Sequence, residues 1–426
     1  MNSPHVNSIV VQKFGGSSVA NATRIMNVAR RIVRTYQGGN RVVVVLSAQG
    51  DTTDHLYEKA REVNPDADKR ELDMLLCTGE QQSVALMAMA IQSLGHKAVS
   101  LNAAQVGIRA TDTHGNAHIE DIETARILAE LAKDRIVLVA GFQGVNRFND
   151  LTTLGRGASD TTAVALAAVL KARVCEIYSD VDGIYTVDPR IVPTAKKLRE
   201  IGYDDMLELA FAGVQMLHGR AVEMAKRYGV HIVVRSSMEA PGGSESSGSE
   251  STGSESSGTW IKENAEVEQL SVSGIAIDRN VTRISLMNIP DEPGAAFQIF
   301  SLLAKAEISV DIILRSVAHG STCDISFTIQ RGDLPATQSL LEIHQEDIGF
   351  TAMDINEGLA KISVVGAGMA TNHGVAAAMF EALFNAGVNI HMISTSEIKI
   401  AVLVDERQVS KAAGAIHDKF EREMGE

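Results

Sequence analysis

The first residues of the chain that could do chemistry are a lysine, a glycine pair and two serines that follow an apolar run. Residues 9–18 read Ile-Val-Val-Gln-Lys-Phe-Gly-Gly-Ser-Ser, and an amphipathic helical pattern begins after them. Gly15 and Gly16 lack a Cβ atom, so their backbone N–H groups can approach an anion, and the helix start adds positive potential. Lys13 adds a full charge. The stretch predicts a phosphate-binding turn. An ordinary tight turn is the alternative, and the P-loop spacing is absent.

A second glycine-rich turn precedes another apolar helical pattern. Residues 152–160 read Thr-Thr-Leu-Gly-Arg-Gly-Ala-Ser-Asp, and the apolar pattern follows at residues 161–172. Residues 176–190 then read Glu-Ile-Tyr-Ser-Asp-Val-Asp-Gly-Ile-Tyr-Thr-Val-Asp-Pro-Arg. These two segments strengthen the interpretation that the first turn belongs to a ligand site.

Regular elements must position these turns, and apolar runs alternate with helical patterns in the first part of the chain. The strand-like runs lie at residues 9–14, 41–48, 97–103, 135–142, 174–181 and 231–237. The helical patterns lie at residues 18–36, 72–94, 120–133, 160–171 and 214–228. Such alternation predicts an α/β domain in which helices cover both faces of a mainly parallel sheet.

Four side chains stand at or just after the ends of these strand-like runs, namely those of Lys13, Ser47, Phe142 and Asp180. Ligands of open α/β sheets bind at the carboxyl ends of the strands. Polar residues also simply terminate strands, which explains any one of the four but explains all of them together poorly. The four are therefore candidate site residues.

Composition limits the class of protein. A chain of 426 residues is too long for one core, so two or three domains are expected. Its 45% hydrophobic and 22% charged residues are typical of a soluble globular protein, and no apolar run is long enough to span a membrane. The net charge of -14 argues against nucleic-acid binding. Scattered cysteines (Cys77, Cys175, Cys323) and a polar N-terminus unlike a signal peptide predict a cytoplasmic protein.

A low-complexity tract divides the chain. Residues 242–258 contain only Gly, Ser, Glu and Thr. Such a tract cannot bury a core, so it predicts a flexible linker between two halves, whether natural or engineered.

An internal repeat follows the tract. Ile284-Ser285 matches Ile362-Ser363, and further matches continue at an offset of about 80 residues, longer than solenoid repeats. The matched positions are Gly294, Ala296, Phe300, Leu303, Ala306, Ile313 and Ser316 with Gly374, Ala376, Phe380, Leu383, Ala386, Ile393 and Ser396. Each copy reads as strand, glycine turn, helix, strand and further strand, which fits a βαββαβ unit. The glycines could also be plain helix-start turns.

Several motifs, in this order, resemble the aspartokinase family. They are Lys13-Phe-Gly-Gly, Leu46-Ser-Ala, Thr78-Gly-Glu, Gly155-Arg-Gly-Ala-Ser-Asp and Ser179-Asp-Val-Asp-Gly-Ile-Tyr-Thr-Val-Asp-Pro-Arg. The repeat resembles a tandem pair of ACT domains. The resemblance covers nearly the whole chain. It implies a three-layer αβα amino-acid-kinase fold with a mainly parallel sheet, followed by two ferredoxin-like βαββαβ (ACT) domains. The implied divisions are a catalytic domain at 1–240, a linker at 241–259, and ACT domains at 260–358 and 359–426.

The resemblance implies phosphoryl transfer from ATP, bound with Mg²⁺, to the side-chain carboxylate of L-aspartate. The product would be 4-phospho-L-aspartate, in the first step of lysine, threonine and methionine biosynthesis. A carboxylate is already ionised and needs no general base, so catalysis is mostly positioning and charge neutralisation.

The catalytic residues implied by the resemblance are Lys13, bridging the phosphates, and Asp160, orienting Lys13 or the metal-bound phosphates. A solvated strand-end lysine and a helix-capping carboxylate are their alternatives. The implied ATP-binding residues are Lys13, Phe14, Gly15, Gly16, Ser17, Ser179, Asp180, Tyr185, Arg190 and Gln215. No metal-binding set is expected in the protein itself, because His114, His118 and His218 lack ligand spacing and are interpreted as surface or loop residues.

The substrate carries two carboxylates and an ammonium group. Arg156 can bind a carboxylate through two parallel hydrogen bonds, and Glu80 offers a partner for the ammonium. Glu80 could instead cap a helix that begins at Gln81. The implied substrate-binding residues are Ser47, Thr52, Glu80, Phe142, Arg156, Gly157 and Ser159.

ACT domains imply amino-acid effectors, here lysine and/or threonine, and assembly into a homo-oligomer. The implied allosteric residues are Asp291, Gly294, Arg315, Asn389, Ile390 and Thr395.

Three positions depart from the family pattern. Ala158 replaces a usual glycine, which costs little if its φ angle is negative. Gln215 replaces a usual lysine, which predicts weaker ATP binding. Arg315-Ser316 replaces a frequent Gln-Asn, which leaves the effector open.

Two other functions compete with this one. The first is a kinase of the same fold that acts on glutamate or another acid, because one methylene changes binding by only about 1–3 kcal/mol. The second is an amino-acid sensor without catalysis, which Gln215 and Ala158 suggest. The intact candidate site residues oppose it, namely Lys13, Glu80, Arg156 and Asp160.

Overall fold

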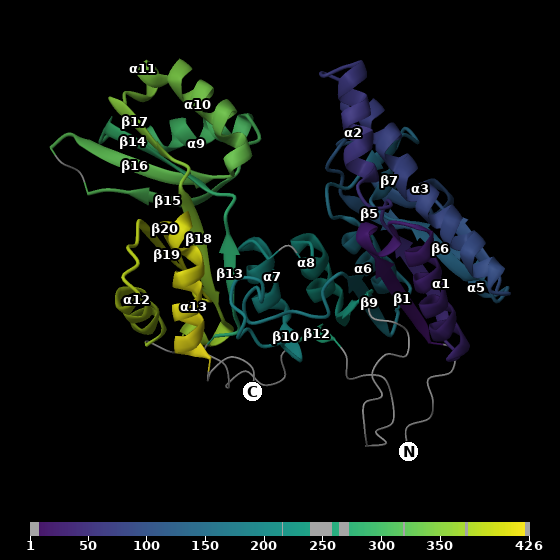
Figure 1. Ribbon diagram of the computed structural model, residues 1–426. Helices are drawn as coiled ribbons and strands as arrows, with labels where there is room; N and C mark the ends of the chain where they lie inside the picture. Colours follow the sequence, from purple (N-terminus) through teal and green to yellow (C-terminus); the bar gives the residue numbers. More distant parts are fainter. Residues whose placement is uncertain are drawn as a thin grey trace. The chain divides into compact units, whose positions relative to one another are not determined.

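The computed structural model describes residues 8–214, 216–238, 258–263, 272–317, 320–370 and 374–421 (Figure 1). Most of the predicted linker at 241–259, and the predicted nucleotide residue Gln215, lie outside the described residues. The chain forms two compact units. The first unit contains residues 1–184, 197–210 and 215–266, and the second contains residues 185–196, 211–214 and 267–426.

Eight strands form the central sheet of the first unit, in the order β10-β12-β11-β9-β1-β2-β6-β3. Their bounds are β1 Ile9–Phe14, β2 Arg41–Leu46, β3 Ala98–Leu101, β6 Ile136–Ala140, β9 Val174–Ser179, β10 Glu200–Gly202, β11 Ile232–Ser236 and β12 Thr259–Lys262. Every neighbouring pair is parallel except β11 with β12. Strands β2 and β6 are almost wholly apolar and buried, as expected for strands covered on both faces. The predicted mainly parallel sheet is confirmed.

Helices cover both faces of this sheet. Their bounds are α1 Ala22–Gln37, α2 Thr52–Val63, α3 Lys69–Ser93, α4 Ala103–Val106, α5 Ala125–Leu131, α6 Ser159–Val169, α7 Tyr203–Phe211 and α8 Gly219–Tyr228. The apolar face of the predicted amphipathic helix is that of α1 from Ile25 to Val33, which is buried with α3 against Val44 and its neighbours in β2. Successive side chains of a strand point to opposite faces. The other face of β2 therefore receives α6, which packs against β1, β2 and β9.

A smaller sheet in the same unit has the strand order β5-β4-β7-β8. The bounds are β4 Ile108–Ala110, β5 Ile119–Ile122, β7 Gln143–Val145 and β8 Leu151–Thr153. The helix predicted over residues 120–133 is wrong at its start, because β5 pairs antiparallel with β4 there and α5 begins only at Ala125. A short segment with few apolar residues does not distinguish the 3.6-residue period of a helix from the two-residue alternation of a strand.

The second unit contains two four-stranded sheets, β15-β16-β14-β17 and β13-β18-β20-β19. The strands are β13 Gly274–Asp278, β14 Thr282–Pro290, β15 Val310–Arg315, β16 Thr322–Ile329, β17 Ala352–Asn356, β18 Leu359–Val365, β19 Met392–Thr395 and β20 Lys399–Asp405. The helices are α9 Ala295–Lys305, α10 Leu334–Ile343, α11 Gln345–Ile348, α12 Val375–Asn385 and α13 Val409–Phe420. All strand pairs are antiparallel, and the helices of each repeat pack on its own sheet (Figure 1).

The predicted βαββαβ order is present in the first repeat, from β14 through α9, β15, β16 and α10 to β17. In the second repeat β13 supplies the outer strand by pairing with β18. Strand β13 therefore lies before the first repeat in sequence but belongs to the sheet of the second. Strand β12, beyond residue 258, belongs to the sheet of the first unit. Both strands differ from the expected boundaries, because pairing partners are set by the tertiary fold. In the described part of the chain, no helix has both the length and the hydropathy of a membrane span.

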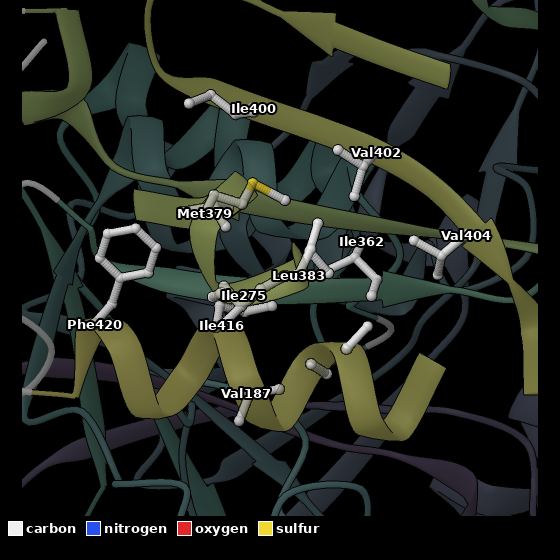
Figure 2. Packing of buried hydrophobic residues seen from close by; sticks show 14 of the residues in the cluster. Val187, Ile275, Ile362, Met379, Leu383, Ile400, Val402, Val404, Ile416 and Phe420 are labelled. Atoms are coloured by element: carbon white, nitrogen blue, oxygen red, sulfur yellow. The ribbon is translucent and has the colours of Figure 1, made fainter. Parts of the chain in front are cut away.

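A short segment from the first half of the sequence is part of the second unit. Residues 185–196 bring Val187 and Val192 into the core that contains Ile416 and Phe420 of α13, as Figure 2 shows for Val187. The buried ring of His417 lies with its Nε2 3.0 Å from the Thr186 Oγ1 atom. The segment is therefore anchored to α13 by apolar packing and by a buried hydrogen bond.

Candidate active site

The ends of β1 and α6 bring two charged side chains together. The Nζ atom of Lys13 lies 2.6 Å from the Oδ1 atom of Asp160, and the two side chains are 13% and 8% exposed. Lys13 is thus no solvated strand-end lysine. Asp160 stands in the first turn of α6, where a carboxylate also interacts favourably with the helix dipole, although its side chain is not the cap of the helix.

The glycines after β1 leave the backbone open beside this pair. A Cβ atom on Gly16 would lie 2.6 Å from the carbonyl oxygen of Ala48, so that position requires glycine. A Cβ atom on Gly15 would face the Lys13 Nζ atom at 3.7 Å. Ser17 is exposed at the start of the following 3₁₀ turn, Gly16–Val19. The turn can therefore present N–H groups to an anion next to Lys13.

Phe14 and Ser179 have supporting positions. The Phe14 side chain is fully buried and stacks on Tyr178 with 4.6 Å between the ring centroids, so only its backbone can reach a ligand. The Ser179 carbonyl accepts a hydrogen bond of 2.8 Å from the Ser237 hydroxyl, and the Ser179 hydroxyl donates to Asp180 at 2.9 Å. The ends of β9 and β11 are fixed together in this way.

Glu80 is a buried carboxylate on α3. The side chain is only 3% exposed, and its Oε1 atom accepts a hydrogen bond of 3.1 Å from the backbone N–H of Ala48. Its Oε2 atom has no hydrogen-bond partner among the described residues. Burial raises the pKa of Glu80 to about 7, although the Ala48 bond opposes the rise. The helix runs from Lys69 to Ser93, so the alternative that Glu80 caps a helix start is wrong.

Ser47 and Thr52 belong to the chain segment that follows β2, the segment whose Ala48 N–H donates to Glu80. Both side chains are partly exposed, and the Thr52 hydroxyl donates to the Gln49 carbonyl at 2.6 Å. Gly79 of α3 packs against this segment, because a Cβ atom there would lie 2.8 Å from the Ala48 Cβ.

The second glycine-rich turn carries an exposed arginine. Gly155 and Gly157 have φ angles of +94° and +80°, which favour glycine. Ala158 has a φ of -74°, so the expectation that alanine fits there is confirmed. The Arg156 guanidinium lies 3.0 Å from the Asp54 Oδ1 atom of α2, and the two side chains are 77% and 56% exposed. Ser159, by contrast, is buried at the start of α6.

Phe142 contacts both sides of the second glycine-rich turn through its backbone. Its φ of +68° is unusual for a bulky residue and marks local strain. Its N–H donates to the Thr162 hydroxyl at 3.3 Å, and its carbonyl accepts from the Leu154 N–H at 2.9 Å.

Tyr185 and Arg190 belong to the second unit and stay predictions as nucleotide-binding residues. Arg190 forms an ion pair with Asp188 at 2.8 Å, and Asp188 also accepts from the Arg190 N–H at 2.9 Å. The guanidinium lowers the pKa of Asp188. Asp188 therefore stabilises a turn through a side-chain bond to the backbone two residues further on.

Three of the six residues expected in the regulatory site lie around the start of α9. A cavity of about 400 Å³ is lined there by Asp291, Gly294, Arg315 and neighbouring residues, and Asp291 forms an ion pair with Arg315. Asn389 and Ile390 precede β19, and Thr395 ends it, all in the second repeat.

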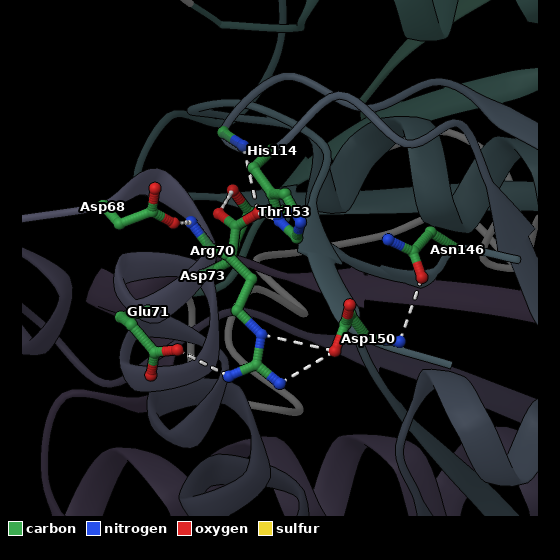
Figure 3. A network of polar contacts seen from close by, with 9 residues as sticks. Asp68, Arg70, Glu71, Asp73, His114, Asn146, Asp150 and Thr153 are labelled. Carbon is green, nitrogen blue, oxygen red and sulfur yellow. Dashed lines mark hydrogen bonds and ion pairs between the residues drawn. The ribbon is translucent and has the colours of Figure 1, made fainter. Parts of the chain in front are cut away.

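Sequence reasoning missed a buried carboxylate that fixes the loops around the second glycine-rich turn. Asp73 of α3 is 1% exposed and accepts hydrogen bonds from the His114 Nδ1 atom at 2.8 Å, the Gly115 N–H at 3.0 Å and the Thr153 hydroxyl at 2.6 Å (Figure 3). His114 is thus a loop residue with a buried partner. No spacing in the sequence indicates this network, because its members lie far apart in the chain.

His218, interpreted as a surface or loop residue, lies in the loop directly before α8. Its ring accepts a hydrogen bond of 3.3 Å from the Arg220 N–H and so caps α8. The backbone N–H of His218 donates to the Asp160 Oδ2 atom at 3.4 Å. Burial lowers the pKa of His218.

Two family models match the chain. The amino acid kinase family matches residues 8–236, and an ACT domain family matches residues 362–420. Among curated proteins, the aspartokinase of Geobacillus stearothermophilus is 48% identical over 414 residues, covering 97% of both chains. Aspartokinase 2 of Bacillus subtilis is 45% identical over 414 residues, covering 97% of this chain and 98% of the relative.

Solved structures give the same result. The structure of E. coli aspartokinase III in complex with aspartate and ADP has a TM-score of 0.79 at 25% identity and covers 97% of this chain and 100% of the other. The same enzyme in complex with lysine and aspartate has a TM-score of 0.74 at 26% identity, with 96% and 99% covered.

Proposed function

The chain belongs to the aspartokinase family, and from that premise we propose which of its residues transfer phosphate from ATP to aspartate. It is an aspartate kinase, a transferase of amino-acid biosynthesis that is subject to allosteric regulation. The observation that carries the assignment of residues is the nearly buried ion pair of Lys13 and Asp160 at the carboxyl edge of the sheet, together with the half-partnered carboxylate of Glu80.

Lys13 and the backbone of Gly15 and Gly16 bind the phosphates of ATP in this proposal. Asp160 holds the Lys13 ammonium in place, so that its charge meets the transferred group without a reorganisation step. The complex of E. coli aspartokinase III with aspartate and ADP supports nucleotide binding by this fold. Ser17, Ser179, Asp180 and Gln215 complete the proposed nucleotide site within the first unit, whereas Tyr185 and Arg190 stay predictions from the family resemblance.

Mg²⁺ would accompany the nucleotide and neutralise charge on the phosphates. Asp160 fits such a role, because among the described residues its Oδ2 atom receives only a long hydrogen bond of 3.4 Å from the His218 backbone N–H. Protein sites for Mg²⁺ typically supply one or two carboxylates beside the substrate phosphates.

Aspartate binds through opposite charges in this proposal. The unpartnered Oε2 atom of Glu80 receives the ammonium, and Arg156 binds a carboxylate in place of Asp54. Ser47, Thr52, Phe142, Gly157 and Ser159 line the same site. The reacting carboxylate needs no base, since the site only has to orient it toward the phosphate that Lys13 holds.

Regulation is proposed to act through the two repeats. Lysine and/or threonine would bind at Asp291, Gly294 and Arg315 and at the loop before β19 with Thr395. The cavity at α9 and the lysine complex of E. coli aspartokinase III support this. We also propose a cytoplasmic homo-oligomer assembled through the ACT repeats, with a catalytic domain that extends to β12.

The direct test is trapping of the acyl phosphate with hydroxylamine in the presence of MgATP and a panel of acidic amino acids. L-aspartate should give the hydroxamate at the highest kcat/KM. A higher value for L-glutamate would reassign the substrate, and no hydroxamate with any acid would favour the sensor without catalysis.

A further inference from the structure

Arg220, near the start of α8, reaches out of its own helix to two distant loops. Its Nη1 atom donates to the Leu154 carbonyl at 2.7 Å and to the Asn116 Oδ1 atom at 3.3 Å, and its Nη2 atom donates to the Ala117 carbonyl at 3.0 Å. Leu154 and Ala117 are fully buried. The guanidinium therefore joins the segment just after β8 to the loop between β4 and β5.

The atoms that accept hydrogen bonds from Arg220 lie next to the Gly155–Gly157 turn, which carries Arg156. Leu154 directly precedes Gly155, where a Cβ atom would lie 2.9 Å from the Asn116 Oδ1 atom. On the other side of the turn, a Cβ atom on Gly157 would lie 3.2 Å from the His218 ring. The turn thus fits tightly between Asn116 and His218.

Arg220 forms hydrogen bonds with both residues that flank the turn, Asn116 and His218. The side chain of Arg220 holds Asn116, and its backbone N–H donates to the His218 ring at 3.3 Å. The His218 N–H in turn donates to Asp160 at 3.4 Å, so the start of α8 contacts the catalytic carboxylate as well.

In the described part of the chain, no Asp or Glu oxygen lies within ion-pair distance of the Arg220 guanidinium. Burial lowers the pKa of Arg220, although the negative charge of Glu223 opposes this shift. An arginine that is kept half-buried on neutral oxygens fixes backbone geometry through its planar set of donors, which lysine cannot reproduce.

We propose that Arg220 is a positioning residue for aspartate binding: it sets the Gly155–Gly157 turn and, through it, the direction of Arg156. The inference rests on the proposed role of Arg156 as the carboxylate ligand. A merely structural tie would affect folding, and would affect ATP and aspartate alike.

The test compares Arg220→Ala with Arg156→Ala and with the double variant. Arg220→Ala should raise the aspartate KM about tenfold and change the ATP KM less than twofold. The reason is that a small displacement of the Arg156 guanidinium weakens its bonds to the substrate carboxylate. Added methylguanidinium should restore part of the loss. In the Arg156→Ala background, Arg220→Ala should cause no further rise, since it acts through Arg156.

Arg227→Ala is the matched control, because Arg227 is an exposed arginine in the last turn of the same helix. Thermal unfolding checks that each variant folds. If Arg220→Ala does not fold, Arg220→Lys decides, with a raised aspartate KM and an unchanged ATP KM expected.

An unchanged aspartate KM in a folded Arg220 variant, an equal rise of both KM values, or a full additional rise in the Arg156→Ala background would overturn the inference. A normal aspartate KM in Arg156→Ala alone would instead remove Arg156 from the proposed site. The two failures are therefore distinguishable.

Discussion

The two ends of the proposed active site differ in how their charges are held. At one end Lys13, Asp160 and Glu80 are nearly buried, and their partners are fixed by strands and by long helices. At the other end Arg156 and Asp54 meet in the open, at 77% and 56% exposure. Buried charges need fixed partners because they have lost water, whereas an exposed ion pair contributes only about 0–1 kcal/mol. The buried end is therefore preorganised for the nucleotide and ammonium, and the exposed end can exchange its partner for a substrate.

The strongest test of the buried end is removal of its cation. Lys13→Ala should lower kcat about 100- to 1,000-fold, the usual effect of losing one fixed group that stabilises developing charge. Lys59→Ala, an exposed lysine of α2, is the control. A kcat near that of the wild type would show that the buried pair is structural and that the contrast between the ends has no catalytic meaning.

Glu80→Gln tests whether the unpartnered oxygen binds the ammonium. A truncated buried partner typically costs about 2–5 kcal/mol, so the aspartate KM should rise about 100-fold at pH 8. Because the pKa of Glu80 is raised to about 7, the wild-type aspartate KM should fall as the pH increases from 6 to 8. The variant should lack this dependence. A flat wild-type profile would contradict the assignment.

The same substitution should stabilise the protein at high pH. The folded-state pKa of about 7 lies above the ordinary value of 4.5, so the contribution of Glu80 to stability is complete below pH 4.5 and is lost as the pH rises through 7. The difference corresponds to about 3 kcal/mol at most. Thermal unfolding should give Glu80→Gln a higher Tm than the wild type at pH 8 and a similar Tm at pH 4.5. A lower Tm at pH 8 would mean that the carboxylate is a net stabiliser.

Arg156→Ala tests the exposed end. The aspartate KM should rise about 30-fold and kcat should fall, a smaller effect than at the buried end because solvent screens the lost charge. The ATP KM is the internal control and should stay within twofold. Equal effects at both ends would remove the distinction between them.

The smallest effect is expected from Asp54→Asn. If Asp54 only occupies Arg156 until aspartate arrives, its loss should lower the aspartate KM about two- to threefold at low ionic strength, and added salt should reduce the difference. An increased KM would show that Asp54 orients the arginine rather than competing for it.

Local patterns in the sequence predicted the buried end better than the exposed one. The period of α1 identified its buried face, and Lys13 could be placed at the end of a strand. The position of Glu80 in the middle of α3 was harder to see, because a residue after Thr-Gly could equally start a helix. Its unpaired oxygen and raised pKa follow from burial, which is a property of the whole fold.

Long-range contacts were outside the reach of the sequence. Arg220 bonds to loops 66 and 103 residues away, and no spacing indicates such partners. Strands β12 and β13 were misassigned to the first repeat for the same reason, since a strand pattern shows a face but not a neighbour. Periodicity therefore predicted elements, and the resemblance to a family predicted the site that joins them.

The insertion of residues 185–196 into the second unit limits how these enzymes can exchange parts. A hybrid that takes everything after residue 266 from a relative would match a foreign α13 to the native Val187 and Val192, which pack against Ile416 and Phe420. The hydroxyl of Thr186 would likewise meet whatever replaced His417. Recombination at the linker alone would thus create a poorly packed core. We therefore expect residues 185–196 and the second unit to change together in evolution, although the two segments are not contiguous in the sequence.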